Sequence, residues 1–173
     1  MKQHDLQALL CGVRKGSESA FSELYDLLAK PVYVIAFRIT QSRELAEDLT
    51  QDTFLKLYLS PPDETVRNPR AWIFRMTHNL SLDACRKQQP EELPEELPDP
   101  QDAVGQTLLR AALEDAMHTL SQEEREVLSL HLNADLTFQE IAKISDRSLP
   151  SVYRCYKRAL RRLRAALEEG ESV

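Results

Sequence analysis

Glycine is scarce in this chain, with only 4 glycines among 173 residues. Folds built from many short strands need numerous turn positions with positive φ, which glycine fills most easily. Leu, Ala, Glu, Arg and Gln dominate instead, and these residue types favour helices. The composition therefore predicts an all-α protein.

Cysteines and long apolar runs are also few. Cys11, Cys85 and Cys155 lie far apart, and only His78, seven residues before Cys85, lies near one of them, which is not a metal-ligand spacing. No stretch approaches the roughly 20 apolar residues that cross a bilayer, and no signal-peptide core is evident. We expect a cytoplasmic protein with no metal, no other cofactor and no direct membrane insertion, whose cysteines are small core residues.

The net charge of -6 argues against nucleic-acid binding, but the charges are unevenly distributed. Residues 147–164 contain seven Lys or Arg residues and no acid, whereas residues 91–102 carry only acidic charges. This reversal indicates separate modules with different partners.

The segment 88–101 (QQPEELPEELPDPQ) has four prolines, five acids and little to bury, so it is typical of an extended linker. It predicts two small helical domains, residues 1–88 and 103–173, joined by an acidic Pro-rich linker over 89–102.

Helix starts in the first half are predicted from capping residues. One helix is expected after Ser17, another after Ser42, and a long one from the pair Asn68 and Pro69 to about residue 87. Pro31 is expected in the first turn of a separate helix that ends near residue 40, because a proline there loses no hydrogen bond.

The second half is expected to open with a helix over residues 103–118. Ser121 with Glu124, and Thr137 with Glu140, then match the capping-box pattern and predict two further helix starts. A short helix over 137–144, a turn over 145–148 and a long basic helix over 149–169 together form a candidate helix-turn-helix. The alternative is a solvated amphipathic hairpin.

Apolar spacing divides the last helix into two faces. The residues expected to pack inward are Val152, Ala159, Leu160, Leu163 and Leu167. The residues expected to face outward are Tyr153, Arg154, Lys157, Arg158 and Arg161. Basic side chains on an outward face suit phosphates and guanine edges, although many basic helices are merely solvated.

The helix after Ser42 carries several acidic residues, which would repel DNA and suit a basic protein surface. The alternative is that these residues are simply solvated. Near the later stripe formed by Arg75, Asn79 and Arg86, three aromatic side chains are expected to be available for stacking on unpaired bases, namely Tyr58, Trp72 and Phe74. At such a position Trp72 is more often a core residue.

Several stretches together resemble the extracytoplasmic-function (ECF) group of bacterial sigma factors, over nearly the whole chain. GSESAFSELYDLL, ELAEDLTQDTFLKLY and NPRAWIFRMTHNLSLDACRK are similar to the second conserved region of that family. LSQEEREVLSLHLNADLTFQEIAKI and RALRRLRAAL are similar to its fourth region. The resemblance implies a sigma factor that binds core RNA polymerase and directs promoter-specific initiation, with an anti-sigma factor as a possible further partner.

The resemblance also implies site residues. Contacts with the clamp helices of the polymerase β′ subunit would come from Glu47, Asp48, Gln51 and Phe54. The melted minus-ten element would be read by Arg75, Asn79, Asp83, Arg86 and Lys87, with the loop 60–67 framing a flipped base. The duplex minus-thirty-five element would be read by Ser151, Tyr153, Arg154, Lys157 and Arg158, and the fourth region would also contact the β flap.

The chain departs from the family's pattern at the turn. Asp146 and Arg147 stand where the family commonly has Gly and an apolar residue, and Pro150 with Ser151 replaces Gly-Thr. Asp tolerates a left-handed conformation and Pro is acceptable in a first helical turn, so the fold is expected to survive.

Two alternatives remain open at this stage. One is an interaction protein that imitates a sigma factor and sequesters its regulator, and the other is a two-domain repressor that reads duplex DNA alone. An enzyme is the poorest fit, because the sequence has no phosphate-binding glycine loop, no nucleophile motif and no plausible metal-ligand set.

Overall fold

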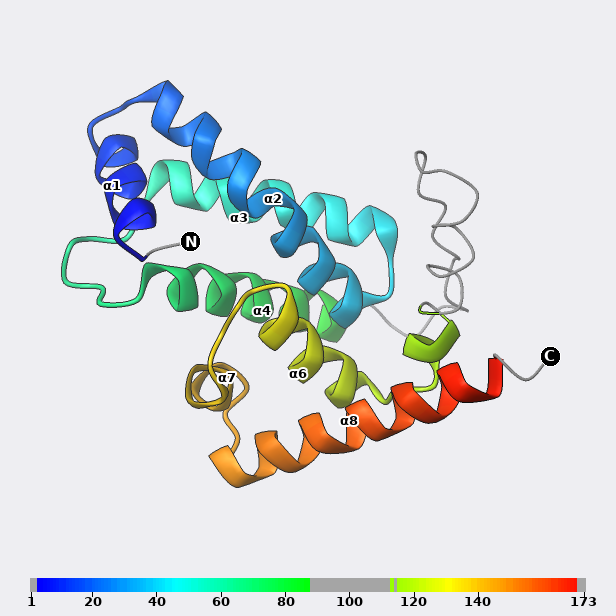
Figure 1. Ribbon diagram of the computed structural model, residues 1–173. Coiled ribbons are helices and arrows are strands. Elements are labelled where there is room, and N and C mark those ends of the chain that lie inside the picture. Colours follow the sequence, from blue (N-terminus) through cyan, green and yellow to red (C-terminus); the bar gives the residue numbers. More distant parts are fainter. Residues whose placement is uncertain (1–2, 88–112, 114, 171–173) are drawn as a thin grey trace.

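The computed structural model describes residues 3–87, 113 and 115–170, and the regular structure in these residues is helical (Figure 1). The helices in the first half are α1 (Gln3–Arg14), α2 (Glu18–Thr40), α3 (Arg43–Leu59) and α4 (Pro69–Lys87). Those in the second half are α6 (Gln122–Leu132), α7 (Phe138–Ile144) and α8 (Leu149–Gly170). The all-α prediction is confirmed, while the linker and most of the helix expected over 103–118 lie outside the described residues.

Helix α2 corrects one prediction, because it runs unbroken through Pro31 instead of starting anew there. A proline inside a helix costs about 3 kcal/mol. Leu28, Val32 and Ile35 on the same helix are almost fully buried, and each such side chain contributes about 1.5–3 kcal/mol. Burial of the continuous apolar face therefore outweighs the local cost of the proline.

The predicted helix starts of the first half are confirmed in their hydrogen bonds. The hydroxyl oxygens of Ser17 and Ser42 accept bonds from backbone N–H groups at the starts of α2 and α3. Asn68 Oδ1 accepts a bond of 3.0 Å from the backbone N–H of Ala71, and Pro69 is the first residue of α4.

The second half packs its three helices around the predicted turn. Ser121 with Glu124, and Thr137 with Glu140, each form both bonds of a capping box at the starts of α6 and α7. Helix α8 then runs along α6 and α7, at the lower edge of the molecule in Figure 1.

The two halves share a core. Apolar residues of both halves belong to one buried cluster, which includes Leu24, Ile73 and Phe74 from the first half and Leu130, Leu136 and Ile141 from the second. Helix α6 lies against α2, and α7 lies against α4. Each half also has a smaller cluster of its own: Ala36, Phe37, Ala46 and Leu49 in the first, and Ala116, Met117, Leu120, Leu128, Ala159 and Leu163 in the second.

Polar contacts cross the same boundary. His78 Nε2 on α4 lies 2.9 Å from Glu126 Oε1 on α6, and both side chains are buried. Arg70 Nε donates a bond of 2.6 Å to the carbonyl oxygen of Ala134. Glu126 Oε2 also lies 3.9 Å from Arg147 Nη2 in the helix-turn-helix turn, so one buried carboxylate links α4 to that turn.

Among the described residues, no helix combines the length and apolar character that a transmembrane span requires.

Candidate nucleic-acid interface

An open hollow lies over α4 and the end of α3. Its volume is about 470 Å³. The side chains that line it are Lys56, Trp72, Arg75, Met76, Asn79, Leu80 and Asp83. Three of the five residues assigned by resemblance to minus-ten DNA therefore surround one cavity, because Arg75, Asn79 and Asp83 recur every four residues along one face of the helix.

Trp72 is partly buried, and its position at the wall of this hollow reconciles the two interpretations of that residue. Trp72 packs against the core cluster and also lines the hollow. Phe74, which was also expected to be available for stacking, is 0% exposed, so that expectation is corrected. Hydrogen-bonding groups on Asn79 and Arg75, beside an aromatic surface, are the combination that holds an unpaired base.

The remaining two minus-ten candidates, Arg86 and Lys87, are exposed at the end of α4 and do not line the hollow. Arg86 Nη1 lies 3.6 Å from Asp83 Oδ1, one turn earlier. This pair is largely solvated, so it is a weak interaction that a phosphate is able to displace.

The acidic face of α3 is exposed at Glu47, Asp48 and Gln51. Phe54 is different, because only 3% of it is exposed and its ring packs against Phe21 and Tyr25. The expectation that Phe54 supplies a side chain to this surface is therefore corrected.

The large apolar side chains that do reach the surface of α3 are Leu55, Tyr58 and the terminal Leu59, which are 55%, 52% and 68% exposed. Sequence reasoning did not select Leu55 and Tyr58 for a protein interface, because the apolar spacing alone does not show whether Phe54 or its neighbour Leu55 faces the core. A closer count would have found them, since Leu55 and Tyr58 follow Asp48 and Gln51 at helical spacing.

The turn of the helix-turn-helix adopts the conformation that the sequence predicted. Asp146 has φ 52°, in the left-handed region, and Pro150 lies in the first turn of α8. Arg147, which replaces an apolar residue of the family pattern, lies 3.4 Å from Glu123 and 3.9 Å from Glu126. The unusual turn thus has partners on α6 that a Gly and an apolar residue would lack.

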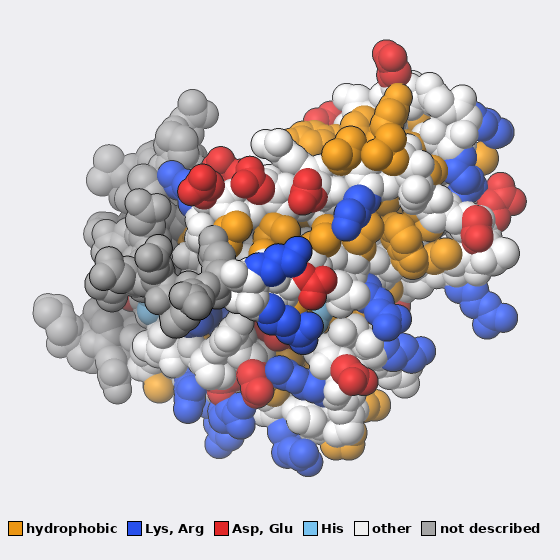
Figure 2. All heavy atoms as spheres, turned by 180° about the vertical axis from the view of Figure 1, so that it is seen from behind, with side chains coloured by type: hydrophobic (Ala, Val, Ile, Leu, Met, Phe, Trp, Pro, Cys, Tyr) orange, Lys and Arg blue, Asp and Glu red, His pale blue; other side chains and the backbone are white. Residues whose placement is uncertain are grey.

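The outward face of α8 is solvent-exposed at Tyr153, Arg154, Lys157, Arg158 and Arg161, and Ser151 is partly exposed. Figure 2 shows Lys and Arg side chains gathered along the lower edge of the molecule, where α8 lies. Lys157 Nζ lies 5.5 Å from the ring centroid of Tyr153, a cation–π distance. One inward assignment is wrong: Leu160 is 39% exposed, whereas Cys155 is buried and Tyr156 packs against the core.

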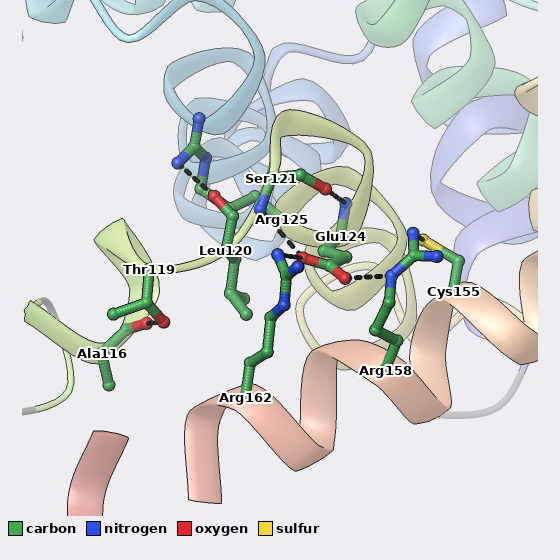
Figure 3. Close-up of polar contacts among 9 residues, drawn as sticks. All are labelled: Ala116, Thr119, Leu120, Ser121, Glu124, Arg125, Cys155, Arg158 and Arg162. Atoms are coloured by element: carbon green, nitrogen blue, oxygen red, sulfur yellow. Dashed lines mark hydrogen bonds and ion pairs between the residues drawn. The ribbon is translucent and has the colours of Figure 1, made fainter. Parts of the chain in front are cut away.

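Glu124 is the residue whose role the sequence revealed only in part. Its side chain is 0% exposed, and besides completing the capping box it contacts Arg158 Nε and lies 2.8 Å from Arg162 Nη1 (Figure 3). Burial opposes ionisation, but the Ser121 N–H bond and the two arginines together outweigh it, and the pKa of Glu124 is lowered. The same contact raises the pKa of Arg158.

The cysteines of the described residues are free thiols. Cys155 is buried, Cys11 and Cys85 are partly buried, and burial raises the pKa of both Cys85 and Cys155. Within the described part of the chain, no three His, Cys, Asp or Glu side chains lie close enough together to hold a metal ion.

Two family models match the chain in order. Residues 24–91 match Sigma-70 region 2, and residues 116–165 match Sigma-70, region 4. Together they cover about two thirds of the chain, including α4 with its hollow and most of α8.

Curated relatives and solved structures are similar over nearly the full length. The ECF RNA polymerase sigma factor SigK of Mycobacterium ulcerans is 25% identical, over 96% of both chains. SigM of Bacillus subtilis is 26% identical, over 86% of this chain and 95% of its own length.

Two solved structures share the fold. The chain superposes on CnrH in complex with the cytosolic domain of CnrY with a TM-score of 0.68 at 22% identity, covering 95% of this chain and 98% of that one. The sigma factor RpoE of Bartonella quintana, in complex with the anti-sigma factor NepR, gives 0.66 at 21% identity, over 86% of this chain and 96% of that one.

Proposed function

The chain belongs to the ECF group of the sigma-70 family of RNA polymerase sigma factors, and on that premise we propose how its parts bind polymerase and promoter. It is a promoter-specific initiation factor whose partners are core RNA polymerase and promoter DNA. The first domain comprises residues 1–88, the linker 89–102 and the second domain 103–173.

The exposed face of α3 binds the clamp helices of the β′ subunit through Glu47, Asp48 and Gln51. Acidic and amide side chains suit a basic protein surface and would repel DNA. Leu55 and Tyr58 supply the apolar contact in place of the buried Phe54, since aromatic anchors are common at the centres of protein interfaces.

The hollow over α4 receives an unpaired base of the melted minus-ten strand. Asn79, Arg75 and Asp83 offer donors and acceptors to the base edge, and Trp72 offers an aromatic face for stacking. Arg86 and Lys87, further along the helix, neutralise the neighbouring phosphates.

The loop over residues 60–67 frames this base on the side of α3. Thr65 donates both its backbone N–H and its hydroxyl to Asp63 Oδ1, at 2.9 and 2.5 Å, which fixes the turn within the loop. The loop is also held to α1, because Arg14 Nη1 donates a bond of 2.5 Å to the carbonyl oxygen of Pro62.

The exposed face of α8 enters the major groove of the minus-thirty-five duplex. Arg154 and Arg158 are suited to guanine edges or phosphates, and Lys157 is suited to a phosphate. Ser151, near the start of the helix, meets a phosphate oxygen, and the rest of the second domain contacts the β flap.

Simultaneous reading of both elements requires the halves to separate. A compact chain of this length is about 40 Å across, whereas roughly 25 base pairs at about 3.4 Å each place the two elements about 85 Å apart. The shared core and the His78–Glu126 contact therefore belong to the free chain, and core polymerase binds a form in which that boundary is open.

The chain leaves catalysis to polymerase and acts in the cytoplasm, where polymerase transcribes. An anti-sigma factor is a further partner, which is supported by the fold it shares with RpoE, solved in complex with the anti-sigma factor NepR.

One observation carries the proposal: a single chain combines a hollow suited to an unpaired base with an exposed basic helix suited to duplex DNA. The test is run-off transcription from genomic templates with purified core polymerase, with and without the chain. Specific transcripts that depend on the chain are expected. Binding to core without any specific transcript would instead indicate a sigma mimic, and tight binding to a duplex operator without core would indicate a repressor.

A further inference from the structure

Glu124 holds a charged carboxylate in a fully buried position, where an unpaired charge is strongly disfavoured. Both of its oxygens are engaged, one by Arg158 and the other by Arg162 and by the backbone N–H of Ser121, at 2.8 and 2.9 Å. The capping box needs only the Ser121 contacts, so the two arginine contacts require a further explanation.

The arginines reach Glu124 from α8, one turn apart, and each remains about half exposed. Arg158 uses its Nε atom for Glu124 and makes only a weak contact of 4.0 Å from Nη2 to Cys155 Sγ, so hydrogen-bond donors remain on both terminal amino groups for another partner. Arg158 also lies one turn beyond Arg154, on the exposed basic face. Figure 3 shows the guanidinium of Arg158 held between Glu124 and Cys155, and about half of the Arg158 side chain nevertheless remains exposed.

We propose that Glu124 is a positioning residue for duplex recognition: it fixes the guanidinium of Arg158 in the orientation in which it meets a guanine edge or a phosphate in the major groove. This inference rests on the proposed function of α8. Arginine recognises guanine through a planar fork of donors, and a fork that is already oriented loses less freedom on binding. Arg162 binds the other oxygen of Glu124, which prevents the carboxylate from rotating into an orientation in which it bonds only to Ser121.

Glu124→Gln is the informative substitution. Glutamine occurs naturally at this position of a capping box, so E124Q keeps the Ser121 bonds and removes the charge that holds the arginines. Glu140→Gln is the matched control, because Glu140 occupies the same place in the capping box of α7 and contacts no residue of α8 in the described structure.

The assay uses holoenzyme reconstituted from core polymerase and the full chain. The probe is a duplex selected by wild-type holoenzyme from random sequence, compared with the same duplex after its minus-thirty-five segment is scrambled. We expect E124Q to reduce the affinity ratio between the two duplexes about tenfold while affinity for the scrambled duplex is unchanged. E140Q should leave the ratio unchanged.

A double-mutant cycle with Arg158→Lys separates positioning from mere stabilisation. R158K keeps the charge but removes the fork, and it should also reduce the ratio about tenfold. If Glu124 acts through Arg158, the double variant loses little more than either single variant, whereas independent actions would give about a hundredfold loss. Additive losses, or an unchanged ratio in E124Q, would overturn the proposal.

A second variant covers the case in which E124Q does not fold. Arg162→Gln removes one arginine contact of Glu124 but leaves the buried carboxylate paired with Arg158. We expect the affinity ratio between the selected and scrambled duplexes to fall about threefold. An unchanged ratio would again overturn the proposal. If wild-type holoenzyme selects no duplex at all, the proposed function of α8 fails, which is a different outcome from failure of the positioning role.

Discussion

The buried contact between His78 and Glu126 gives a sharp prediction about the boundary between the two halves. Glu126→Ala removes the partner of His78 Nε2 and leaves that polar atom buried. An unsatisfied buried polar group costs about 1–3 kcal/mol. We therefore expect the free energy of unfolding to fall by about 2 kcal/mol and the melting temperature to fall by about 4–8 °C.

Glu123→Ala is the matched control for this change. Glu123 lies on the same helix and contacts the same arginine, Arg147, but its side chain is 60% exposed and contacts no residue of the first half among the described residues. A surface ion pair of this kind contributes about 0–1 kcal/mol. Urea or thermal unfolding of the two variants compares a boundary contact with a surface contact of the same chemistry.

Although E126A should be less stable than wild type, we expect it to bind core polymerase more tightly. Because core polymerase binds the open form, a weaker boundary raises the fraction of competent chains. A change of about 2 kcal/mol corresponds to at most about 30-fold tighter apparent binding to core. Fluorescence anisotropy of labelled chain against core measures this, and scattering of the free E126A variant should give a larger radius of gyration. Weaker core binding by E126A than by E123A, or equal stability of the two variants, would refute the reasoning.

Four further outcomes are expected. Asp48→Lys should weaken binding to core about tenfold or more by placing a like charge against a basic surface, with duplex binding by the second half unchanged; an unchanged core affinity would remove α3 from the interface. Asn79→Ala should slow promoter opening about 2- to 10-fold, measured by permanganate footprinting, while the formation of the closed complex is unaffected. A defect confined to the closed complex would contradict the role of the hollow. Arg154→Glu should reduce minus-thirty-five binding about 10- to 100-fold and leave core affinity intact; equal loss of both would give α8 another role. The lowered pKa of Glu124 means that the contribution of its ionised form to stability is complete above the ordinary pKa of 4.5 and is lost as the pH falls through the lowered pKa. E124Q should therefore lose less stability than wild type in that acid range. Identical acid-unfolding profiles of the two proteins would contradict this expectation.

Much of the local structure could be predicted because its signals are satisfied within a few residues. The hydroxyl and carboxylate pairs of the two capping boxes lie three residues apart, so Ser121 and Thr137 predicted the starts of α6 and α7 without reference to the rest of the chain. The left-handed Asp146 and the proline in the first turn of α8 are likewise backbone preferences of single residues. The positions of Arg75 and Asn79 on one face followed from helical periodicity, whereas Asp83 was assigned through the family resemblance.

The features that could not be predicted depend on partners far along the chain. Pro31 stays inside α2 because distant helices bury the apolar face on both sides of it, and Phe54 is buried because α2 brings Phe21 and Tyr25 against it. Nothing in the local pattern distinguishes Leu160, which is exposed, from an inward leucine one turn away.

The sequence by itself determined the helices, their caps, the division of charge between the halves and the resemblance that identified the family. Only the tertiary structure decided that the two halves share a core, that His78 meets Glu126 across 48 residues, and that Glu124 meets Arg158 across 34. The physical reason is that helix starts are fixed by hydrogen bonds within one turn, whereas buried charges choose their partners only after packing has excluded water from around them.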